Sequence, residues 1–262
     1  MNPIYLDYNG TTPIDPQIAE SMAPFINEHF GNPSSSHYFG SEPRSALDKA
    51  RGQVANMLGC QPHEVIFTSG GTESNNQAVR GVIDASNMRE PHLITSSVEH
   101  PSIINVCRFL EMKGVSVTYL PVDKYGMINP YDVEDSIRSN TALISIMHAN
   151  NEVGTIQPLE QICEIAKKHQ IPVHTDSAQS VGKIPVNVTN LGVDLLSIAG
   201  HKLYAPKGVG ALYVKEGVQF NDLLYGASQE MGRRPGTENV IFSVALGEAC
   251  NLIERKITYY SE

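Results

Sequence analysis

Short apolar runs alternate with amphipathic stretches over most of the chain, from about residue 45 onward. The apolar runs are bounded by turn-forming residues and are too short for helices, so they predict strands. Seven such runs occur, at residues 64–68, 92–96, 115–120, 142–147, 171–174, 195–198 and 209–214. The stretches between them place apolar residues at helical spacing. They predict helices at residues 45–58, 73–84, 101–113, 130–138 and 158–169, and a final helix from about residue 240.

The order of these elements predicts the fold class. Apolar strands separated by helices are typical of a mostly parallel sheet that helices cover on both faces. We therefore predict a three-layer α/β/α fold with a seven-stranded sheet. Residues 1–40 are rich in Gly, Pro, Asn and Ser, and we expect them to be irregular. Parallel sheets bind ligands at the carboxyl ends of their strands, so the residues that follow the predicted strands form the candidate site.

A glycine pair follows the first predicted strand and opens the next helix, in the segment Thr68-Ser69-Gly70-Gly71-Thr72-Glu73. Glycines let the backbone approach a ligand closely, and the first N–H groups of a helix bind anions such as phosphate. Thr72 could add a hydroxyl donor. An ordinary strand-to-helix turn in which Thr72 caps the helix explains the segment equally well.

Three further strand ends carry polar side chains that could serve one ligand. His100 follows the second predicted strand, and its imidazole could stack on a planar ring or simply cap the next helix. Asp176 follows the fifth, where a buried carboxylate needs a partner such as a protonated pyridine nitrogen, although it could also cap the following turn. Lys202 follows the sixth, where burial would lower the pKa of its amine and favour imine formation. Taken by itself, Lys202 is more simply explained as a surface lysine beside Lys207.

Together the four strand ends supply the groups that one cofactor requires. An aldehyde cofactor with a phosphate and a pyridine ring needs an amine, a carboxylate, a stacking ring and an anion cradle. One shared ligand explains all four clusters more simply than four unrelated coincidences do. The residues therefore predict a site for pyridoxal 5'-phosphate, with Lys202 as the lysine that holds it as a Schiff base.

Composition excludes several other classes of function. The formal net charge of −9 argues against a nucleic-acid partner, because phosphate backbones require a basic surface. No apolar run approaches the roughly 18 residues of a membrane span, so no membrane partner is expected. The four cysteines lie far apart and form no disulfide or metal-binding pattern. The first residues lack the features of a leader peptide, and we expect a cytoplasmic protein.

The same residues carry a resemblance to a known family. The chain resembles the NifS-like cysteine desulfurases and selenocysteine lyases, in the class V aminotransferase group of fold-type I pyridoxal phosphate enzymes. The matching segments are YLDYNGTTP (5–13), GNPSSSH (31–37), FTSGGTESNN (67–76), ITSSVEH (94–100), HANNEVG (148–154), HTDSAQSVGK (174–183), GHKLYAPKGVGALYV (200–214) and RPGTEN (234–239). By this resemblance residues 1–262 form the large, cofactor-binding domain of such an enzyme, with residues 1–40 as an irregular N-terminal segment.

The resemblance implies roles for the residues around the cofactor ring. Lys202 holds the cofactor and later moves protons at the substrate carbon. His100 stacks on the ring and serves in acid–base chemistry. Asp176 pairs with the pyridine nitrogen, Gln179 bonds the ring hydroxyl, and Asn151 lies near the substrate.

The resemblance also assigns the cofactor phosphate. Gly71, Thr72 and His201 hold it, with Ala199 at a position where the family usually has serine. Thr237 reaches the phosphate of the other subunit, which implies a two-fold homodimer.

The reaction that the resemblance implies takes sulfur from L-cysteine, or selenium from L-selenocysteine, and leaves L-alanine. In such enzymes a cysteine thiolate of a small C-terminal domain attacks the substrate's sulfur or selenium. That domain and its catalytic cysteine are absent from this chain, and none of Cys60, Cys107, Cys163 and Cys250 has the required sequence context. A role in sulfur metabolism and iron–sulfur cluster assembly implies a sulfur-acceptor protein as a further partner.

Two other interpretations stay open. The chain could be a catalytically incomplete module that binds the cofactor and dimerises. It could also be a class V aminotransferase or lyase that needs no thiol. Formation of alanine and sulfide from L-cysteine separates a desulfurase from the first of these, and a keto-acid product would indicate the second.

Overall fold

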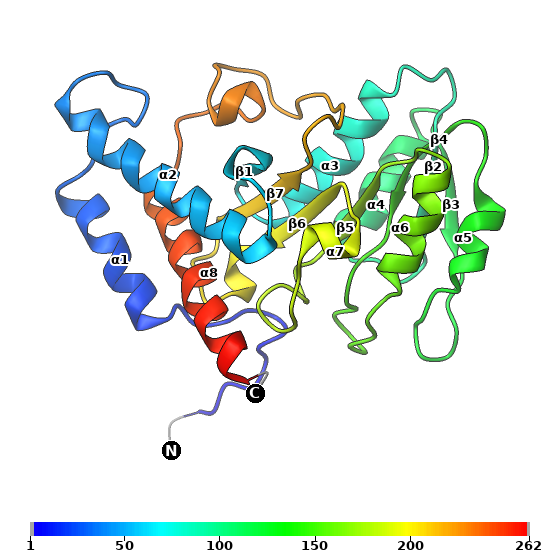
Figure 1. Ribbon diagram of the computed structural model, residues 1–262, viewed down its shortest axis with the longest axis horizontal. Coiled ribbons are helices and arrows are strands. Elements are labelled where there is room, and N and C mark those ends of the chain that lie inside the picture. Colours follow the sequence, from blue (N-terminus) through cyan, green and yellow to red (C-terminus); the bar gives the residue numbers. More distant parts are fainter. Residues whose placement is uncertain (1–2, 261–262) are drawn as a thin grey trace.

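Seven strands form one sheet at the centre of the computed structural model, which describes residues 3–260 (Figure 1). The strand order is β1-β7-β6-β5-β4-β2-β3. The strands are β1 (Val65–Thr68), β2 (His92–Ser96), β3 (Ser116–Leu120), β4 (Thr141–Ser145), β5 (Val173–Asp176), β6 (Leu195–Ala199) and β7 (Gly210–Val214). Only the pairs that include β7 are antiparallel, so the predicted mostly parallel, seven-stranded sheet is confirmed.

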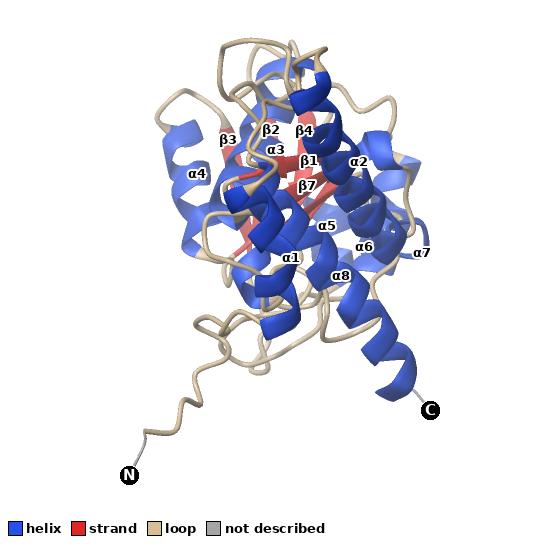
Figure 2. Ribbon diagram, turned by 90° about the vertical axis from the view of Figure 1, so that its left-hand side faces the viewer, coloured by secondary structure: helices blue, strands red, loops and turns tan. Residues whose placement is uncertain are grey.

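Helices cover both faces of this sheet. They are α1 (Pro16–Asn27), α2 (Tyr38–Leu58), α3 (Gly71–Ala85), α4 (Pro101–Glu111), α5 (Pro130–Ser136), α6 (Leu159–Lys168), α7 (Val188–Leu191) and α8 (Val240–Tyr260). Short 3₁₀ turns lie at η1 (Pro62–Glu64), η2 (Gly200–Lys202) and η3 (Glu230–Gly232). Figure 2 shows the strands enclosed by helices.

The alternation of side chains along the strands explains the three layers. Ile66 of β1 packs with α3 and α4 in one apolar cluster. Its neighbours Val65 and Phe67 pack in the other cluster, with residues of α1, α2, α5, α6 and α8. Successive side chains of a strand point to opposite faces, so strands such as β1, β6 and β7 contribute to both clusters. The predicted three-layer architecture is confirmed.

The prediction of an irregular segment over residues 1–40 is wrong in two places. Residues Pro16–Asn27 form α1, which begins where the Asp15 side chain accepts a hydrogen bond from Gln17 N. Helix α2 begins at Tyr38 and continues through Pro43. The helical signal is weak here because α1 buries only Ile18 and both helices contain a proline. The short α7 was not predicted, and residues 1, 2, 261 and 262 of the expected domain lie outside the described residues.

The last helix packs against the first two helices of the chain. α8 packs against both α1 and α2, and Figure 1 shows the three helices together at one end of the molecule. Within the described residues, no helix is both long and apolar enough to cross a membrane.

Candidate active site

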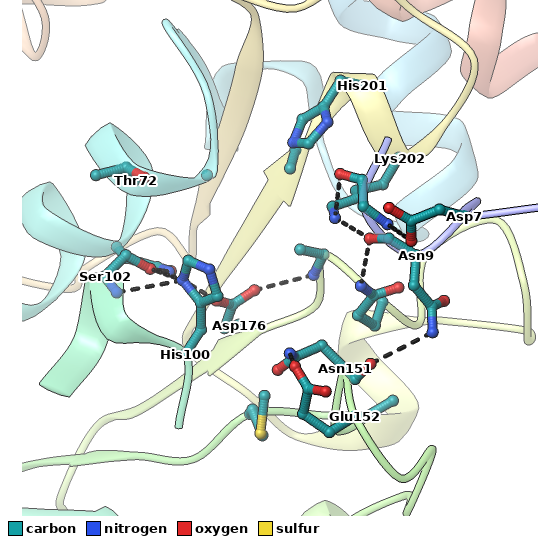
Figure 3. Close-up of a pocket in the computed structure, with 18 residues that line it drawn as sticks. Asp7, Asn9, Thr72, His100, Ser102, Asn151, Glu152, Asp176, His201 and Lys202 are labelled. Carbon is teal, nitrogen blue, oxygen red and sulfur yellow. Dashed lines mark hydrogen bonds between the residues drawn. The ribbon is translucent and has the colours of Figure 1, made fainter. Parts of the chain in front are cut away.

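A cavity of about 550 Å³ lies at the carboxyl ends of β5 and β6, beside the first turns of α3 and α4 (Figure 3). All but one of the residues predicted for the site line this cavity: Gly71, Thr72, His100, Asn151, Asp176, Gln179, Ala199, His201 and Lys202. They come from five separate segments of the chain. The sheet brings these segments together at one edge, where its parallel strands end, and parallel sheets bind ligands at that edge.

Thr237 is the predicted residue that the cavity does not include. It is exposed, in the segment that leads into α8. The expected contact of Thr237 is with a second subunit, so its role stays a prediction.

The first turn of α3 forms one end of the cavity. Gly70 occupies the N-cap position and no side chain caps the helix, so the alternative in which Thr72 is the cap is wrong. The first N–H groups of a helix have no partner within it, and here they adjoin the cavity. A Cβ atom at Gly71 would lie 3.2 Å from the Cβ of Ala199, so glycine leaves room at this wall.

His201 faces this end from the opposite wall. Its Nδ1 lies 3.1 Å from Thr11 Oγ1. Burial lowers the pKa of His201, and the positive charges of Lys202, Lys207 and Lys183 lower it further. The same charges that disfavour an imidazolium here would attract an anion.

Asp176 lies beside His100 and Ser102 in the cavity and is only 6% exposed (Figure 3). Its Oδ1 accepts from Ala178 N over 3.0 Å and its Oδ2 accepts from Asn75 Nδ2 over 2.7 Å. Both donors are neutral, and no ion pair is found for Asp176 among residues 3–260. A cationic donor bound in the cavity would stabilise a buried carboxylate of this kind.

The amine of Lys202 projects into the cavity from the 3₁₀ turn η2, directly after β6. Nζ donates to Gly10 O over 2.9 Å and also to Asn9 O. Burial lowers the pKa of Lys202, while the charges of Asp7 and Asp176 oppose that shift. Lys202 is therefore not a plain surface lysine, whereas Lys207 is exposed.

The N-terminal segment contributes a wall of the cavity that sequence analysis missed. Asp7, Asn9 and Gly10 all line it. Asn9 O also accepts from Gln179 Nε2 over 3.3 Å, and Asn9 Nδ2 donates to Asn151 O over 3.3 Å. These residues belong to the quoted segment YLDYNGTTP, which is the one signal that could have indicated them.

Six other lining residues were also missed: Asn75, Ser102, Met147, Ala149, Glu152 and Ala178. Two of them could have been found by spacing. Asn75 follows Gly71 by one helical turn, and Ser102 follows His100 by two residues at the start of α4. Of the others, Ala149, Glu152 and Ala178 belong to the quoted segments HANNEVG and HTDSAQSVGK, and the sequence offers no comparable signal for Met147.

None of the four cysteines is placed to react with a ligand in this cavity. Cys107, Cys163 and Cys250 are buried and Cys60 is partly buried. Burial raises the pKa of each thiol to about 12, which keeps it protonated at neutral pH. None of them is among the lining residues. Over residues 3–260, no group of three His, Cys, Asp or Glu side chains could hold a metal ion.

A buried carboxyl group lies behind the cavity wall. Oε1 of Glu99 accepts from Ser96 Oγ over 2.7 Å and from Met147 N over 2.9 Å, and Met147 lines the cavity. Burial raises the pKa of Glu99 to about 8, and the charge of Asp176 adds to the rise. At pH 7 the group is mostly protonated.

Replacing Glu99 with glutamine is expected to flatten the pH dependence of stability. An unfolded chain releases the Glu99 proton near pH 4.5, whereas the folded chain retains it up to about pH 8. The wild type therefore loses stability as pH rises through this window, by roughly 2–4 kcal/mol. Glutamine keeps an acceptor oxygen and does not titrate.

Urea unfolding at pH 5, 6.5 and 8 measures the difference. Glu99→Gln should gain stability over the wild type as pH increases. The exposed Glu90 provides the control, because Glu90→Gln should keep the slope of the wild type. Equal slopes for Glu99→Gln and the wild type would contradict the assignment of a buried, protonated acid.

Comparison with known proteins gives a consistent set of relatives. The family model described as Aminotransferase class-V matches residues 4–260. The chain is 52% identical to the cysteine desulfurase IscS of Dictyoglomus turgidum, over 95% of this chain and 63% of that protein. It is 44% identical to a cysteine desulfurase of Mus musculus, over 99% of this chain and 57% of that protein. The chain thus spans less than two thirds of the length of these curated relatives.

Solved structures agree with the sequence relatives. A NifS-like protein superimposes with a TM-score of 0.96 at 40% identity, covering 98% of this chain and 71% of that one. The structure of SspA in complex with cysteine superimposes with a TM-score of 0.92 at 43% identity, covering 95% of this chain and 72% of that one. The fold is therefore shared with proteins of this kind.

Proposed function

Because this chain belongs to the class V aminotransferase family, we propose that it is the cofactor-binding large domain of a pyridoxal phosphate-dependent cysteine desulfurase or selenocysteine lyase. The substrate would be L-cysteine or L-selenocysteine, and the organic product L-alanine. The relatives named cysteine desulfurase support this assignment. So does a similar structure that holds cysteine.

One observation carries the proposal: an amine, a buried carboxylate and an uncapped helix terminus border the same cavity. These three groups match the aldehyde, the pyridine nitrogen and the phosphate of pyridoxal 5'-phosphate. When bound, this cofactor supplies an electron sink for a carbanion at the substrate's α-carbon.

Lys202 would hold the cofactor through its aldehyde carbon and afterwards move protons at the substrate. A lowered pKa increases the neutral fraction of its amine, which is the nucleophilic form. The carbonyl oxygens of Asn9 and Gly10 orient the amine from behind. Asp176 would keep the pyridine nitrogen protonated, since within residues 3–260 it accepts hydrogen bonds from neutral donors alone.

The remaining predicted residues have roles that agree with their positions. Gly71, Thr72 and His201 would bind the phosphate, and Ala199 would leave space beside it in place of the usual serine hydroxyl. Gln179 would donate to the ring hydroxyl, exchanging its weak bond to Asn9 O. His100 would stack on the ring, and Asn151 would contact the substrate.

We also propose partners beyond the substrate. Thr237 would reach the phosphate site of a second copy in a two-fold homodimer. A protein that accepts the sulfur would link the reaction to sulfur metabolism and iron–sulfur cluster assembly, as the names of the relatives suggest. The thiolate that attacks the substrate sulfur would come from outside the described cysteines, because none of these lines the cavity. The expected compartment is the cytoplasm.

That lack of a thiol among the lining residues favours a second candidate: a module that binds the cofactor and dimerises without turnover.

An assay with the full chain separates the candidates. The protein is loaded with pyridoxal phosphate and incubated with L-cysteine in the presence and absence of an added thiol, and alanine, sulfide and keto acids are measured. Alanine with sulfide supports a desulfurase. A bound cofactor without turnover supports the module, and a keto acid indicates an aminotransferase. Failure to bind the cofactor would sink the whole proposal.

A further inference from the structure

A continuous chain of hydrogen bonds joins Asp176 to His100 through two residues that have no assigned role. Asn75 Nδ2 donates to Asp176 Oδ2 over 2.7 Å and to Ser102 Oγ over 2.8 Å. Ser102 Oγ lies 2.8 Å from His100 Nδ1, and Ser102 N donates to the same nitrogen over 3.2 Å. All four residues line the cavity, and Figure 3 shows Ser102, His100 and Asp176 grouped on one side of it.

The direction of each bond follows from the groups involved. An ionised carboxylate can only accept, so the amide nitrogen of Asn75, not its oxygen, faces Asp176. This orientation leaves Asn75 Oδ1 buried without a hydrogen-bond partner in the described part of the chain. The opposite orientation would place that oxygen against the carboxylate, which costs more.

The same reasoning fixes the proton on the imidazole. The backbone N–H of Ser102 can only donate, so Nδ1 of His100 accepts. Ser102 Oγ already accepts from Asn75, and its own hydrogen is left to point at His100 Nδ1. Two donors directed at Nδ1 leave no place for a proton on that atom, so neutral His100 carries its proton on Nε2.

We propose that Asn75 and Ser102 are positioning residues that hold neutral His100 as the tautomer protonated at Nε2. In this state His100 offers a hydrogen-bond donor through Nε2, and no lone pair there, so it cannot take a proton from a ligand through that atom. The movement of protons assigned above to Lys202 would then not be shared by His100 acting as a base through Nε2. The tautomer does not depend on the proposed function. Only the use made of it in the reaction rests on that function.

The tautomer can be measured without cofactor or turnover. The full chain is labelled with ¹⁵N-histidine, and the imidazole nitrogen shifts of His100 are recorded at a pH where the ring is neutral. The signals of His100 are identified by their loss in His100→Gln. We expect a protonated Nε2 and an unprotonated, hydrogen-bonded Nδ1.

Matched variants test the two positioning residues. Ser102→Ala removes the hydroxyl donor, and a fraction protonated at Nδ1 should become measurable. Ser102→Thr should restore the wild-type pattern, because it restores the hydroxyl. Asn75→Leu should also raise the fraction of His100 protonated at Nδ1, because the Ser102 hydroxyl, no longer held by Asn75, can turn away from His100. Ser86→Ala, at the far end of α3, should change nothing.

Two results would overturn the proposal. One is a wild-type His100 protonated at Nδ1. The other is an unchanged pattern in both Ser102→Ala and Asn75→Leu, which would show that these side chains do not position the ring. Circular dichroism of each variant checks that it is folded. These spectra need no cofactor. A result that overturns the proposed tautomer can therefore be distinguished from a result that overturns the proposed enzyme function.

Discussion

Replacing Lys202 with alanine is expected to abolish covalent attachment of pyridoxal phosphate and to reduce product formation from L-cysteine by roughly 10³-fold or more. Lys202 is the only lysine among the residues that line the cavity of the described chain. The variant removes both the amine that would hold the cofactor and the group that would move protons at the substrate.

Borohydride reduction followed by peptide mass spectrometry provides the measurement. Wild-type protein should carry the reduced cofactor on the peptide that contains Lys202, and Lys202→Ala should carry none. Lys207→Ala is the matched control, because Lys207 is exposed and lies five residues further along the same loop. It should keep both the adduct and the absorbance of the bound cofactor.

Lys183 is the residue that could contradict this result. Burial lowers the pKa of Lys183 to about 8, and the charge of Lys202 contributes to that shift. Its Nζ donates to Gln179 Oε1, so it lies close to the cavity without lining it. An adduct that persists on Lys183 in Lys202→Ala would show that the assignment of the amine is wrong.

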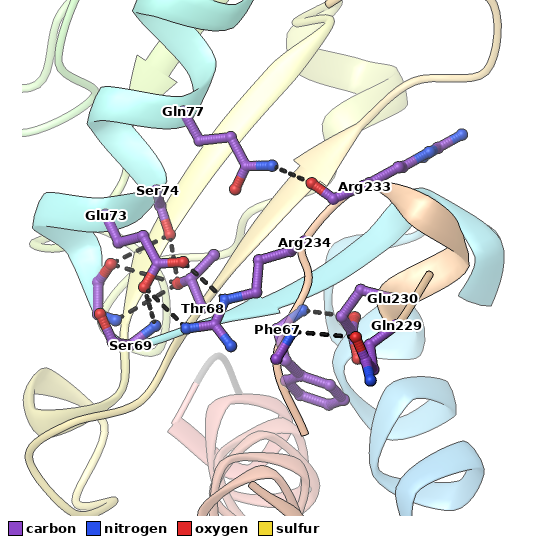
Figure 4. Close-up of polar contacts among 12 residues, drawn as sticks. Phe67, Thr68, Ser69, Glu73, Ser74, Gln77, Gln229, Glu230, Arg233 and Arg234 are labelled. Carbon is purple, nitrogen blue, oxygen red and sulfur yellow. Dashed lines mark hydrogen bonds and ion pairs between the residues drawn. The ribbon is translucent and has the colours of Figure 1, made fainter. Parts of the chain in front are cut away.

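The largest expected loss of stability comes from Glu230→Ala, at about 3–5 kcal/mol in the free energy of unfolding. Arg51 donates to Glu230 Oε2 and Oε1 over 2.7 and 2.8 Å. Phe67 N donates to Glu230 Oε2 over 2.9 Å, and Figure 4 shows these two residues next to each other. The side chains of Arg51 and Glu230 are only 11% and 3% exposed. Removing the carboxylate would leave the Arg51 guanidinium buried without its partner.

The loss of stability in Glu230→Ala should arise mainly because the charged Arg51 guanidinium stays buried without its partner. Replacing both partners with apolar residues, Arg51→Met with Glu230→Leu, should recover most of the loss, since no buried charge then remains. Urea unfolding of the wild type and of each variant measures the differences. Lys215→Ala supplies the comparison, because the Lys215 side chain is 54% exposed and its pair with Asp194 should contribute no more than about 1 kcal/mol. A loss in Glu230→Ala that is no larger than the loss in Lys215→Ala would refute the prediction.

This buried pair also bears on the segment that carries Thr237. Glu230 and Met231 adopt positive φ angles of 48° and 60°, which non-glycine residues rarely do. The contacts of Glu230 hold this strained turn to β1 and α2. Four residues further on, Arg234 Nε binds Glu73 Oε1 over 2.8 Å in the first turn of α3 (Figure 4). The path of the chain toward Thr237 is therefore fixed at two points, the contacts of Glu230 and the ion pair of Arg234 with Glu73.

The residues at the strand ends were predictable because their positions follow from local patterns. Each apolar run identified a strand, and the parallel strands of a sheet end at the same edge. His100, Asp176 and Lys202 could thus be expected in one place from the order of the apolar runs alone. The strand boundaries were accurate to within about two residues, because turn-forming residues bound each apolar run.

The N-terminal segment was not predictable by the same argument. Helix α1 buries a single residue of its own, so its sequence carries only a weak helical period. Asn9 and Gly10 reach the amine of Lys202 through their carbonyl oxygens. Every residue has such an oxygen, so no sequence pattern marks the two that serve the site.

The sequence by itself determined the layered fold, the edge of the sheet where the site lies, and the amine, carboxylate and glycines that meet there. These features depend on periodicity and on side-chain chemistry, which can be read residue by residue. Only the tertiary structure decided which groups surround them: the N-terminal carbonyls behind Lys202, the acid Glu99 behind the wall, and the hydrogen bonds that direct His100. Some of these contacts join residues that are distant in the sequence, and others depend on the orientation of a single amide. Both kinds of contact are determined by how the folded chain packs.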